Sequence, residues 1–161
     1  IGNEEDAADV LDIHAGDTDV HSGSLEIAHY PDVARQIAQR FNNVEQVAIT
    51  LRESISATHN NWGAMLFDVS NDTAVFAPMN GEQYEPFEIR NIVDRVGGGD
   101  SFAAGLIYAM TTRDFATAQD QVDFAVAASC LAHSVKGDFN FTSRAEVEAL
   151  ANGNASGRVQ R

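Results

Sequence analysis

The chain is poor in several residue types, and each shortage excludes a class of protein. Its 161 residues contain one cysteine, Cys130, so no disulfide forms within it, and a lone thiol in an apolar run fits a cytoplasmic setting. Lys136 is the only lysine. Ten lysines and arginines oppose 24 aspartates and glutamates, which gives a formal charge of −14 and argues against a nucleic-acid partner. No apolar run approaches the ~20 residues of a membrane span.

The acid excess has two interpretations, adaptation to salt and ordinary solubility charge, and the composition does not separate them. The length suits one domain. An amphipathic helix at 31–41 followed by a β-branched run at 46–51 is typical of the α/β unit of a parallel sheet. Two short strands, 62–69 and 73–76, are expected to form a hairpin through Asn71 and Asp72.

Further helices are expected at 101–110, 121–135 and 143–150, the last with a capping box of Ser143 and Glu146. The small residues Ala103, Ala104 and Gly105 predict close packing of the first of these helices against the sheet. The acidic stretch 12–24, with His14 and His21, is interpreted as a surface loop. Residues 152–161 are rich in glycine, asparagine and serine, and we expect a flexible tail there.

The run Asp94 to Gly105 (DRVGGGDSFAAG) is the most informative motif. Three glycines precede a helix, so their backbone N–H groups, with the free N–H groups and positive dipole end of that helix, can bind phosphate oxygens. Asp100 projects from the first turn into the same place. A carboxylate beside an anion site predicts phosphoryl transfer to a hydroxyl group, with Asp100 as the base.

Two simpler interpretations stand beside this one. Gly97, Gly98 and Gly99 are consistent with a tight strand-to-helix turn, and Asp100 with a helix cap. The run is not a Walker A loop, because no Gly-Lys-Ser or Gly-Lys-Thr follows. It also lacks the Gly-x-Gly-x-x-Gly spacing of a dinucleotide-binding turn.

The run resembles the second signature of the ribokinase/PfkB-like carbohydrate kinases, usually Asp-Thr-x-Gly-Ala-Gly-Asp-Ser-Phe, with Arg95 and Gly98 departing from the commonest wording. Three flanking motifs are similar to the 2-keto-3-deoxygluconate kinase branch of that family: residues 50–54 (TLRES), 61–62 (NW) and 137–140 (GDFN). The resemblance covers nearly the whole chain. It implies a ribokinase-like α/β fold with a mainly parallel sheet flanked by helices, and ATP and Mg²⁺ as cofactors.

The resemblance also assigns roles to single residues. Asn3 and Asp6 match the family's Asn-x-x-Glu motif for Mg²⁺ and phosphates, with aspartate in place of glutamate. Asp94 matches an aspartate that helps to hold a monovalent cation such as K⁺. Ala128 and Ser129 match positions at the adenine pocket. The alternatives are plain helix capping for Asn3 and Asp6, and a turn cap for Asp94.

Arg52 stands where many relatives have a glycine beside the nucleotide. It is interpreted either as a contact to the ATP phosphates or as a surface cation. Trp62 and His133 are expected to pack in the core. Because the family is about twice as long, residues 1–151 are expected to be its C-terminal, nucleotide-binding part, with the N-terminal half absent.

The expected reaction is phosphorylation of the 6-hydroxyl of 2-keto-3-deoxygluconate. The partners implied are a nucleotide, a sugar acid, the N-terminal half of the same enzyme and, at full length, a further copy in a homo-oligomer. The alternatives are another sugar kinase, such as a fructokinase or ribokinase, and a nucleotide-binding fragment without turnover.

Overall fold

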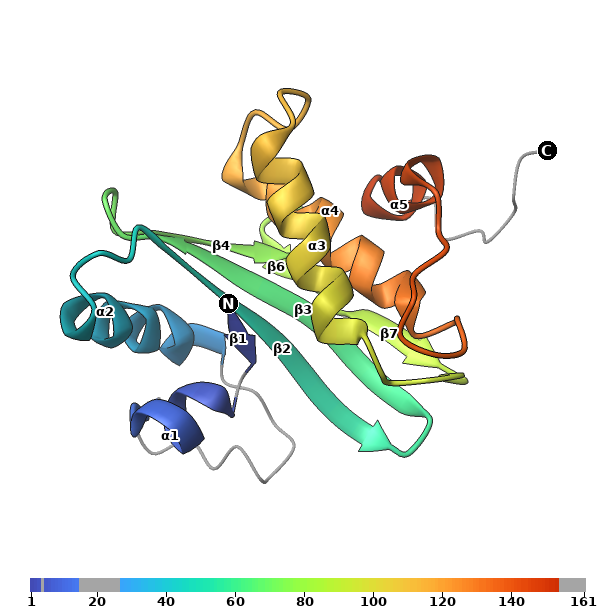
Figure 1. Cartoon of the computed structure of the whole chain (residues 1–161), viewed down its shortest axis with the longest axis horizontal. Coiled ribbons are helices and arrows are strands. Elements are labelled where there is room, and N and C mark those ends of the chain that lie inside the picture. The colour runs from blue at the N-terminus through green and yellow to red at the C-terminus, as the bar shows by residue number, and fades with distance from the viewer. Residues whose placement is uncertain (4, 15–26, 154–161) are drawn as a thin grey trace.

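A five-stranded sheet with helices on both faces forms the framework of the chain in a computed structural model (Figure 1), which describes residues 1–3, 5–14 and 27–153. Most of the predicted loop 12–24, including His21, lies outside these residues, as does the predicted tail from residue 154 onward. The elements in chain order are β1 (Gly2–Asn3), α1 (Asp6–Leu11), a 3-10 turn (Ile27–His29), α2 (Tyr30–Arg40), β2 (Gln46–Ser56), β3 (His59–Asp68), β4 (Thr73–Ala77), β5 (Met79–Asn80), β6 (Gln83–Tyr84), β7 (Phe87–Arg90), α3 (Gly98–Thr111), α4 (Ala118–Ala132) and α5 (Arg144–Ala151).

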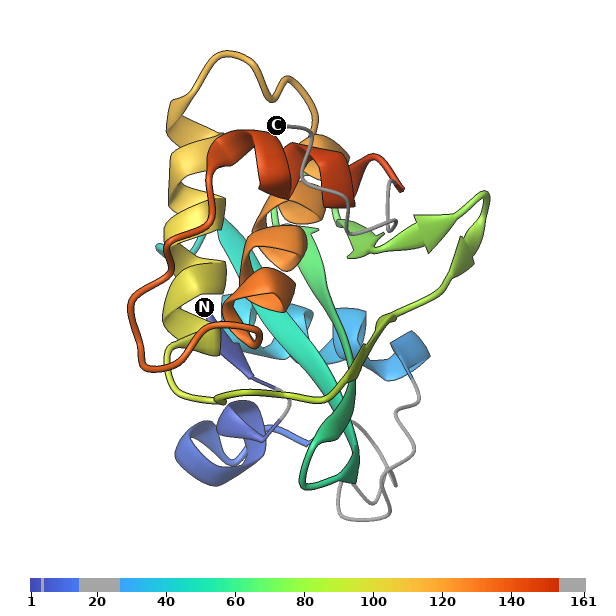
Figure 2. The same cartoon turned by 90° about the vertical axis from the view of Figure 1, so that its right-hand side faces the viewer.

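Alternation along β2 divides the core between the two faces of the sheet. Val47, Ile49 and Leu51 pack with α1 and α2, whereas Ala48 packs with α3 and α4 on the other face. Since both faces are covered there, all of residues 47–51 of β2 are buried, rather than every second one. Figure 2 shows α3 and α4 side by side on their face of the sheet.

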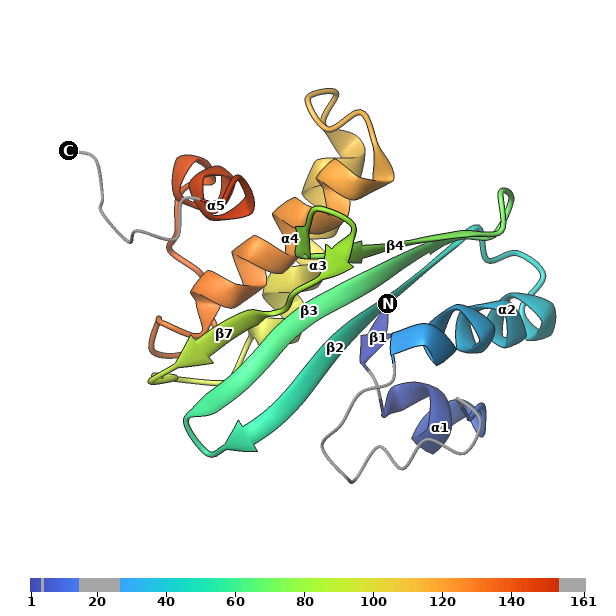
Figure 3. The ribbon, with the colours of Figure 1, turned by 180° about the vertical axis from the view of Figure 1, so that it is seen from behind.

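The sheet is mixed, and the prediction of a mainly parallel sheet is wrong for the strands that the structure describes. β1 pairs with β2 in parallel, but the pairs β2–β3, β3–β4 and β3–β7 are antiparallel. Residues 57–58 and 69–72 join successive strands by links too short for a crossover, so each link reverses the direction of the chain. Figure 3 shows β3 between β2 on one side and β4 and β7 on the other.

Side-chain caps fix where two of the helices begin. The predicted box of Ser143 and Glu146 is confirmed at the start of α5. α4 begins at Ala118, three residues before the predicted start, because Thr117 and Asp120 form a second capping box.

The close packing predicted for α3 occurs against α4 rather than against the sheet. A Cβ on Gly105 would lie 3.1 Å from the Cα of Ala125 on α4. Phe102 and Leu106 make the contact of α3 with the sheet cluster, and Ala104 is exposed. α3 is therefore held by two neighbours, the sheet beneath it and α4 beside it.

Candidate active site

A glycine in a left-handed conformation begins α3. Gly97 is the N-cap, with φ of 80°. A Cβ there would lie 2.7 Å from the carbonyl oxygen of Asp138, so both the backbone angle and the neighbouring bend require glycine. Seven residues, 91–97, link the end of β7 to α3, and Gly97 packs directly on the bend at residues 137–138.

The first N–H groups of α3 are available to a ligand. The N–H groups of Gly98, Gly99 and Asp100 precede the first intrahelical bond, which Ser101 N donates to the Gly97 carbonyl at 2.8 Å. Within the described part of the chain, no side chain or carbonyl accepts a hydrogen bond from these three groups. A Cβ on Gly99 would meet no atom within 4 Å. Free N–H groups and the helix dipole therefore face open space, which suits an anion.

The Asp100 carboxylate is exposed in the first turn of α3. It does not cap the helix, since α3 has no side-chain cap, and it forms no ion pair with any residue that the structure describes. This geometry does not support the capping interpretation of Asp100. The two carboxylate oxygens of Asp100 therefore lie beside the free N–H groups of the first turn.

Asp94 joins the glycine turn to the bend that follows α4. Its Oδ1 accepts the backbone N–H groups of Arg95 (2.8 Å) and Val96 (3.1 Å), and its Oδ2 accepts that of Gly137 (2.9 Å). These bonds, that of Gly137 foremost, hold the pKa of the Asp94 carboxyl below its ordinary value. Asp94 therefore acts as the turn cap that was the alternative interpretation of this residue.

Arg95 holds the other side of the turn. Its Nη2 donates to the carbonyls of Ser56 (2.8 Å) and Ala57 (2.9 Å) and to Oδ1 of Asn60 (3.1 Å). These acceptors belong to the tip of the β2–β3 hairpin. Sequence reasoning missed this contact, because at least 35 residues separate the arginine from its partners.

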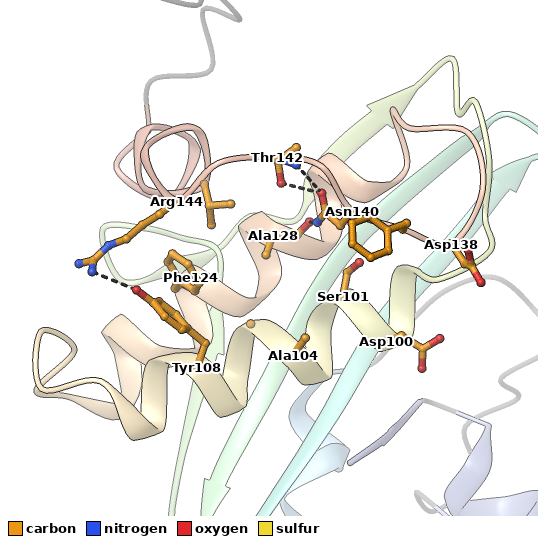
Figure 4. A pocket seen from close by; sticks show the side chains of 13 residues that line it. Asp100, Ser101, Ala104, Tyr108, Phe124, Ala128, Asp138, Asn140, Thr142 and Arg144 are labelled. Carbon is orange, nitrogen blue, oxygen red and sulfur yellow. Dashed lines mark hydrogen bonds between the residues drawn. The ribbon is translucent and has the colours of Figure 1, made fainter.

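A cleft of about 430 Å³ opens between α3, α4 and the segment that leads into α5, and Asp100 lies at its rim. Figure 4 shows Asp100 and Asp138 at one end of this cleft, with Tyr108 and Arg144 at the other. Its walls are largely apolar and aromatic, which is typical of a pocket for a flat organic ring. We call it the helix cleft, and its wall residues include Tyr108, Phe124, Ala128, Phe139 and Asn140.

Of the two residues predicted at the adenine pocket, only Ala128 lines the helix cleft. The carbonyl of Ala128 accepts a bond from Nδ2 of Asn140 at 3.0 Å, which fixes the outer wall. Ser129 is fully buried, and its Oγ donates to the carbonyl of Gly98 at 2.7 Å. Ser129 thus fixes the glycine turn from beneath and does not face the cleft.

Asn3 and Asp6 exchange hydrogen bonds at the entry to α1, whose N-cap is Glu5. Oδ1 of Asn3 accepts the N–H groups of Glu5 (2.8 Å) and Asp6 (2.9 Å), while Oδ2 of Asp6 accepts the N–H of Asn3 (2.8 Å). Asn3 thus bonds N–H groups at the start of α1, the function that the capping interpretation gives it, although the N-cap itself is Glu5. The second carboxylate oxygen of Asp6 remains available to a water molecule.

A smaller pocket of about 130 Å³ lies between the glycine turn and the sheet. We call it the turn pocket. Arg52 reaches it from β2, so the structure brings this residue beside the glycines, as one of its two interpretations requires. The lining residues are Asn3, Thr50, Arg52, Asn60, Trp62, Arg95, Gly98, Gly99 and His133.

Trp62 and His133 pack together beneath the turn, as expected of core residues. Their ring centroids are 4.7 Å apart in an edge-on arrangement. Nδ1 of His133 lies 2.8 Å from the Ser129 carbonyl, the geometry of a ring N–H donor. Burial lowers the pKa of His133, and the charges of Arg95 and Arg52 lower it further, so the ring is neutral at pH 7.

Comparisons with known proteins agree on one family. The family model described as pfkB family carbohydrate kinase matches residues 38–145. A search of curated proteins gives no match. The crystal structure of 2-dehydro-3-deoxygluconokinase from Thermotoga maritima is 42% identical with a TM-score of 0.76, covering 94% of this chain and 40% of that one.

Two further solved structures are similar. A PfkB family carbohydrate kinase from Listeria grayi is 26% identical with a TM-score of 0.68, over 92% of this chain and 39% of that one. A third, from Enterococcus faecalis, has a TM-score of 0.72 over 98% of this chain and 41% of that one; at 21% identity it shows likeness of fold alone. The chain thus spans about 40% of the length of each of these three structures.

Proposed function

Because the chain belongs to the pfkB family of carbohydrate kinases, we propose that it is the nucleotide-binding part of an ATP-dependent sugar kinase. The observation that carries the proposal is the uncapped, exposed carboxylate of Asp100 beside three unpaired N–H groups at the start of α3. A cleft of about 430 Å³ opens from the same helix turn. Phosphoryl transfer needs these three parts together: an anion site, a base and a place for the nucleoside.

In this proposal the nucleoside occupies the helix cleft and its phosphates lie at the glycine turn. The aromatic rings of Tyr108, Phe124 and Phe139 offer stacking surfaces to a base. The N–H groups of Gly98, Gly99 and Asp100 would hold the oxygens of the moving phosphoryl group. Each such preorganised donor is worth roughly 2.7–4 kcal/mol in oxyanion sites of other enzymes.

Asp100 would accept the proton of the attacking hydroxyl group. Because its carboxylate forms no internal bond with the described residues, no interaction has to break before a substrate hydroxyl can approach. Asp94 cannot take this role, since both of its oxygens accept backbone N–H groups. Its part is to hold the turn in the shape that presents the free N–H groups.

The residues near β1 fit Mg²⁺ held through water. One carboxylate oxygen of Asp6 remains open to a water molecule. Among residues 1–3, 5–14 and 27–153, no three or more His, Cys, Asp or Glu side chains come together in a group that could hold a metal directly. Outer-shell binding suits Mg²⁺, which retains water and would neutralise phosphate charge. We also propose that a K⁺ ion can bind beside Asp94. Asp94 would contribute to this site by fixing the shape of the turn.

The substrate that we propose is 2-keto-3-deoxygluconate, phosphorylated at its 6-hydroxyl. Support comes from the name of the Thermotoga maritima relative and its 42% identity. A fructokinase or ribokinase is the alternative within the family.

The structure has no helix that is long and apolar enough to cross a membrane, within the residues it describes. The single cysteine supports a cytoplasmic setting.

A second candidate function follows from the 40% coverage of the relatives. The 161-residue chain by itself is expected to bind ATP or ADP without phosphorylating a sugar, because the sugar-binding residues of such a kinase would come from the rest of its length. Calorimetric titration with ADP measures the binding, and a coupled assay for ADP release measures turnover. Efficient sugar phosphorylation by the chain alone would refute this expectation.

The test of the kinase proposal is Asp100→Asn in a full-length kinase that contains this sequence. We expect turnover to fall by roughly 10²–10⁴-fold, the usual contribution of a general base, with ADP affinity unchanged. Glu82→Gln, an exposed acid in the turn between β5 and β6, is the matched control and should retain full activity. Unchanged turnover in Asp100→Asn would remove the proposed base.

A panel of sugars with the unmodified full-length kinase assigns the substrate. Phosphorylation restricted to 2-keto-3-deoxygluconate supports the proposed branch. Preference for fructose or ribose would replace it with the alternative, while leaving the roles of Asp100 and the glycine turn in place.

A further inference from the structure

The turn pocket combines positive charge with an absence of acid. Arg52 and Arg95 both line it, and none of its lining residues is an aspartate or glutamate. This is unusual in a chain whose formal charge is −14. Gly98 and Gly99, at the N-terminal end of α3, also line the turn pocket. Cationic side chains and a helix N-terminus act on an anion in the same direction.

Two buried donors in the turn pocket have no partner among the described residues. Asn60 is 1% exposed and Trp62 is 5% exposed, and both line the pocket from β3. Nδ2 of Asn60 and Nε1 of Trp62 form no hydrogen bond within the described part of the chain. Buried donors are nearly always paired in folded proteins. Two unpaired donors in one pocket therefore indicate that a ligand with acceptor atoms binds there.

The orientation of the Asn60 amide follows from its neighbour. Nη2 of Arg95 lies 3.1 Å from Oδ1 of Asn60 and can only donate. The oxygen of the amide must therefore face the arginine, and the nitrogen must be the unpaired end. The opposite orientation would set two donors against each other.

We propose that the turn pocket binds a phosphate group of the nucleotide through Nδ2 of Asn60, Nε1 of Trp62 and the charge of Arg52. This inference rests on the proposed function, since it adds side-chain ligands to the backbone N–H groups already described. Phosphate oxygens accept several hydrogen bonds at once, which matches a pocket whose unpaired groups are all donors. The two donor nitrogens are covered by neighbouring atoms, so the side chains must shift as the anion enters.

The single tryptophan gives a direct measurement. A ¹H–¹⁵N spectrum of the 161-residue chain contains one indole N–H signal, that of Trp62. We expect ADP to move this signal and adenosine to leave it unchanged. Inorganic phosphate should move it only at concentrations at least about tenfold higher than ADP, because the nucleoside adds its own binding energy.

Three results would overturn the proposal in different ways. An indole signal that ADP leaves in place while the backbone signals of Gly98 and Gly99 move would remove the turn pocket and keep the proposed function. Inorganic phosphate as effective as ADP would make this a site for free phosphate, against the assignment to the nucleotide. Absence of any ADP binding would remove the proposed function, and this inference with it.

Two substitutions test the donors separately. Asn60→Asp keeps the oxygen that Arg95 needs and replaces only the unpaired donor with a charged acceptor, so the fold is retained. Trp62→Phe removes the N–H and keeps an aromatic ring. We expect ADP affinity to fall by about tenfold or more in each, equivalent to about 1.4 kcal/mol per factor of ten, with adenosine affinity unchanged.

Asn43→Asp is the matched control, because it makes the same change of charge at an exposed position outside the pocket. Its ADP affinity should stay within twofold of the parent chain. ADP affinity within twofold of the parent in both Asn60→Asp and Trp62→Phe would overturn the proposal. If Trp62→Phe unfolds, Asn60→Asp decides the question, since the Arg95 contact supports its fold.

Discussion

At the level of single residues, Gly97 and Gly99 belong to one turn, yet a methyl group would meet different surroundings at each. At Gly97 the backbone is left-handed and the Cβ would lie 2.7 Å from the Asp138 carbonyl oxygen. At Gly99 there is nothing within 4 Å. The first glycine is required by the fold, whereas the second is required only if a ligand approaches its backbone.

This contrast predicts opposite phenotypes. Gly97→Ala should lower the free energy of unfolding by about 2 kcal/mol, from the left-handed backbone and the contact with residue 138. Gly99→Ala should leave the free energy of unfolding within about 0.5 kcal/mol of the parent, because alanine is a better helix former in open space. It should still weaken ADP binding, since its methyl group points where phosphate oxygens must lie.

Urea unfolding and calorimetric titration with ADP measure the two effects. Each variant serves as the control for the other, because the chemical change is identical. Normal ADP affinity in a folded Gly99→Ala chain would show that the phosphates do not approach this part of the turn.

The sequence made some of these residues predictable and hid others, for a physical reason. Asp94, the three glycines and Asp100 lie within seven consecutive residues, so their meeting at the start of one helix needs no knowledge of the fold. Arg95 and Asn60 lie 35 positions apart and meet only when the β2–β3 hairpin folds back on the turn. The chemical role assigned to Asp100 stays a prediction, although its placement is now described.

At the level of elements, the glycine turn is held between two structures by adjacent residues. Asp94 bonds to the bend at Gly137, and Arg95 bonds to the hairpin tip at residues 56–60. The turn contributes few apolar contacts, since Val93 and Val96 are 59% and 61% exposed. Its shape therefore depends on these polar contacts more than on burial.

Arg95→Met tests this dependence. We expect faster amide hydrogen exchange at the hairpin tip and at the glycine turn, with a loss of about 1 kcal/mol of unfolding free energy. Arg90→Met, which removes only a surface contact to Glu88, should leave exchange at both places unchanged. Unchanged exchange in Arg95→Met would show that the turn keeps its shape without the hairpin.

Individual helices and strands are easier to predict from this sequence than the way they assemble. Periodicity and capping boxes are local signals, so the helices near 31–41 and 143–150 were found within a few residues of their bounds. Strand direction depends on the links between strands. The turn at residues 57–58 is Ala-Thr, without the Asn-Gly or Asp-Gly pair that usually reveals a hairpin. The prediction of a mainly parallel sheet instead followed the family resemblance and the helix–strand unit at residues 31–51.

For the whole molecule, the excess of acidic residues decides how salt acts on stability. Salt weakens the attractive ion pairs, such as those of Arg144 with Asp114 and Glu148, and also screens repulsion among the remaining acids. These effects have opposite signs. Because ten cationic side chains face 24 acidic ones, repulsion outweighs attraction, and screening should stabilise the chain overall.

We therefore expect the melting temperature at pH 7 to rise by a few degrees between about 0.01 and 0.5 M sodium chloride, the shift produced by about 1–2 kcal/mol in a chain of this size. The rise should shrink as the pH is lowered toward the isoelectric point of about 4.4, where the net charge and its repulsion vanish. Calorimetric scans in sodium and potassium chloride measure it, and screening alone predicts the same rise in both. A melting temperature that falls with salt at pH 7 would mean that the paired charges, and not the surplus acids, dominate the electrostatics of this fold.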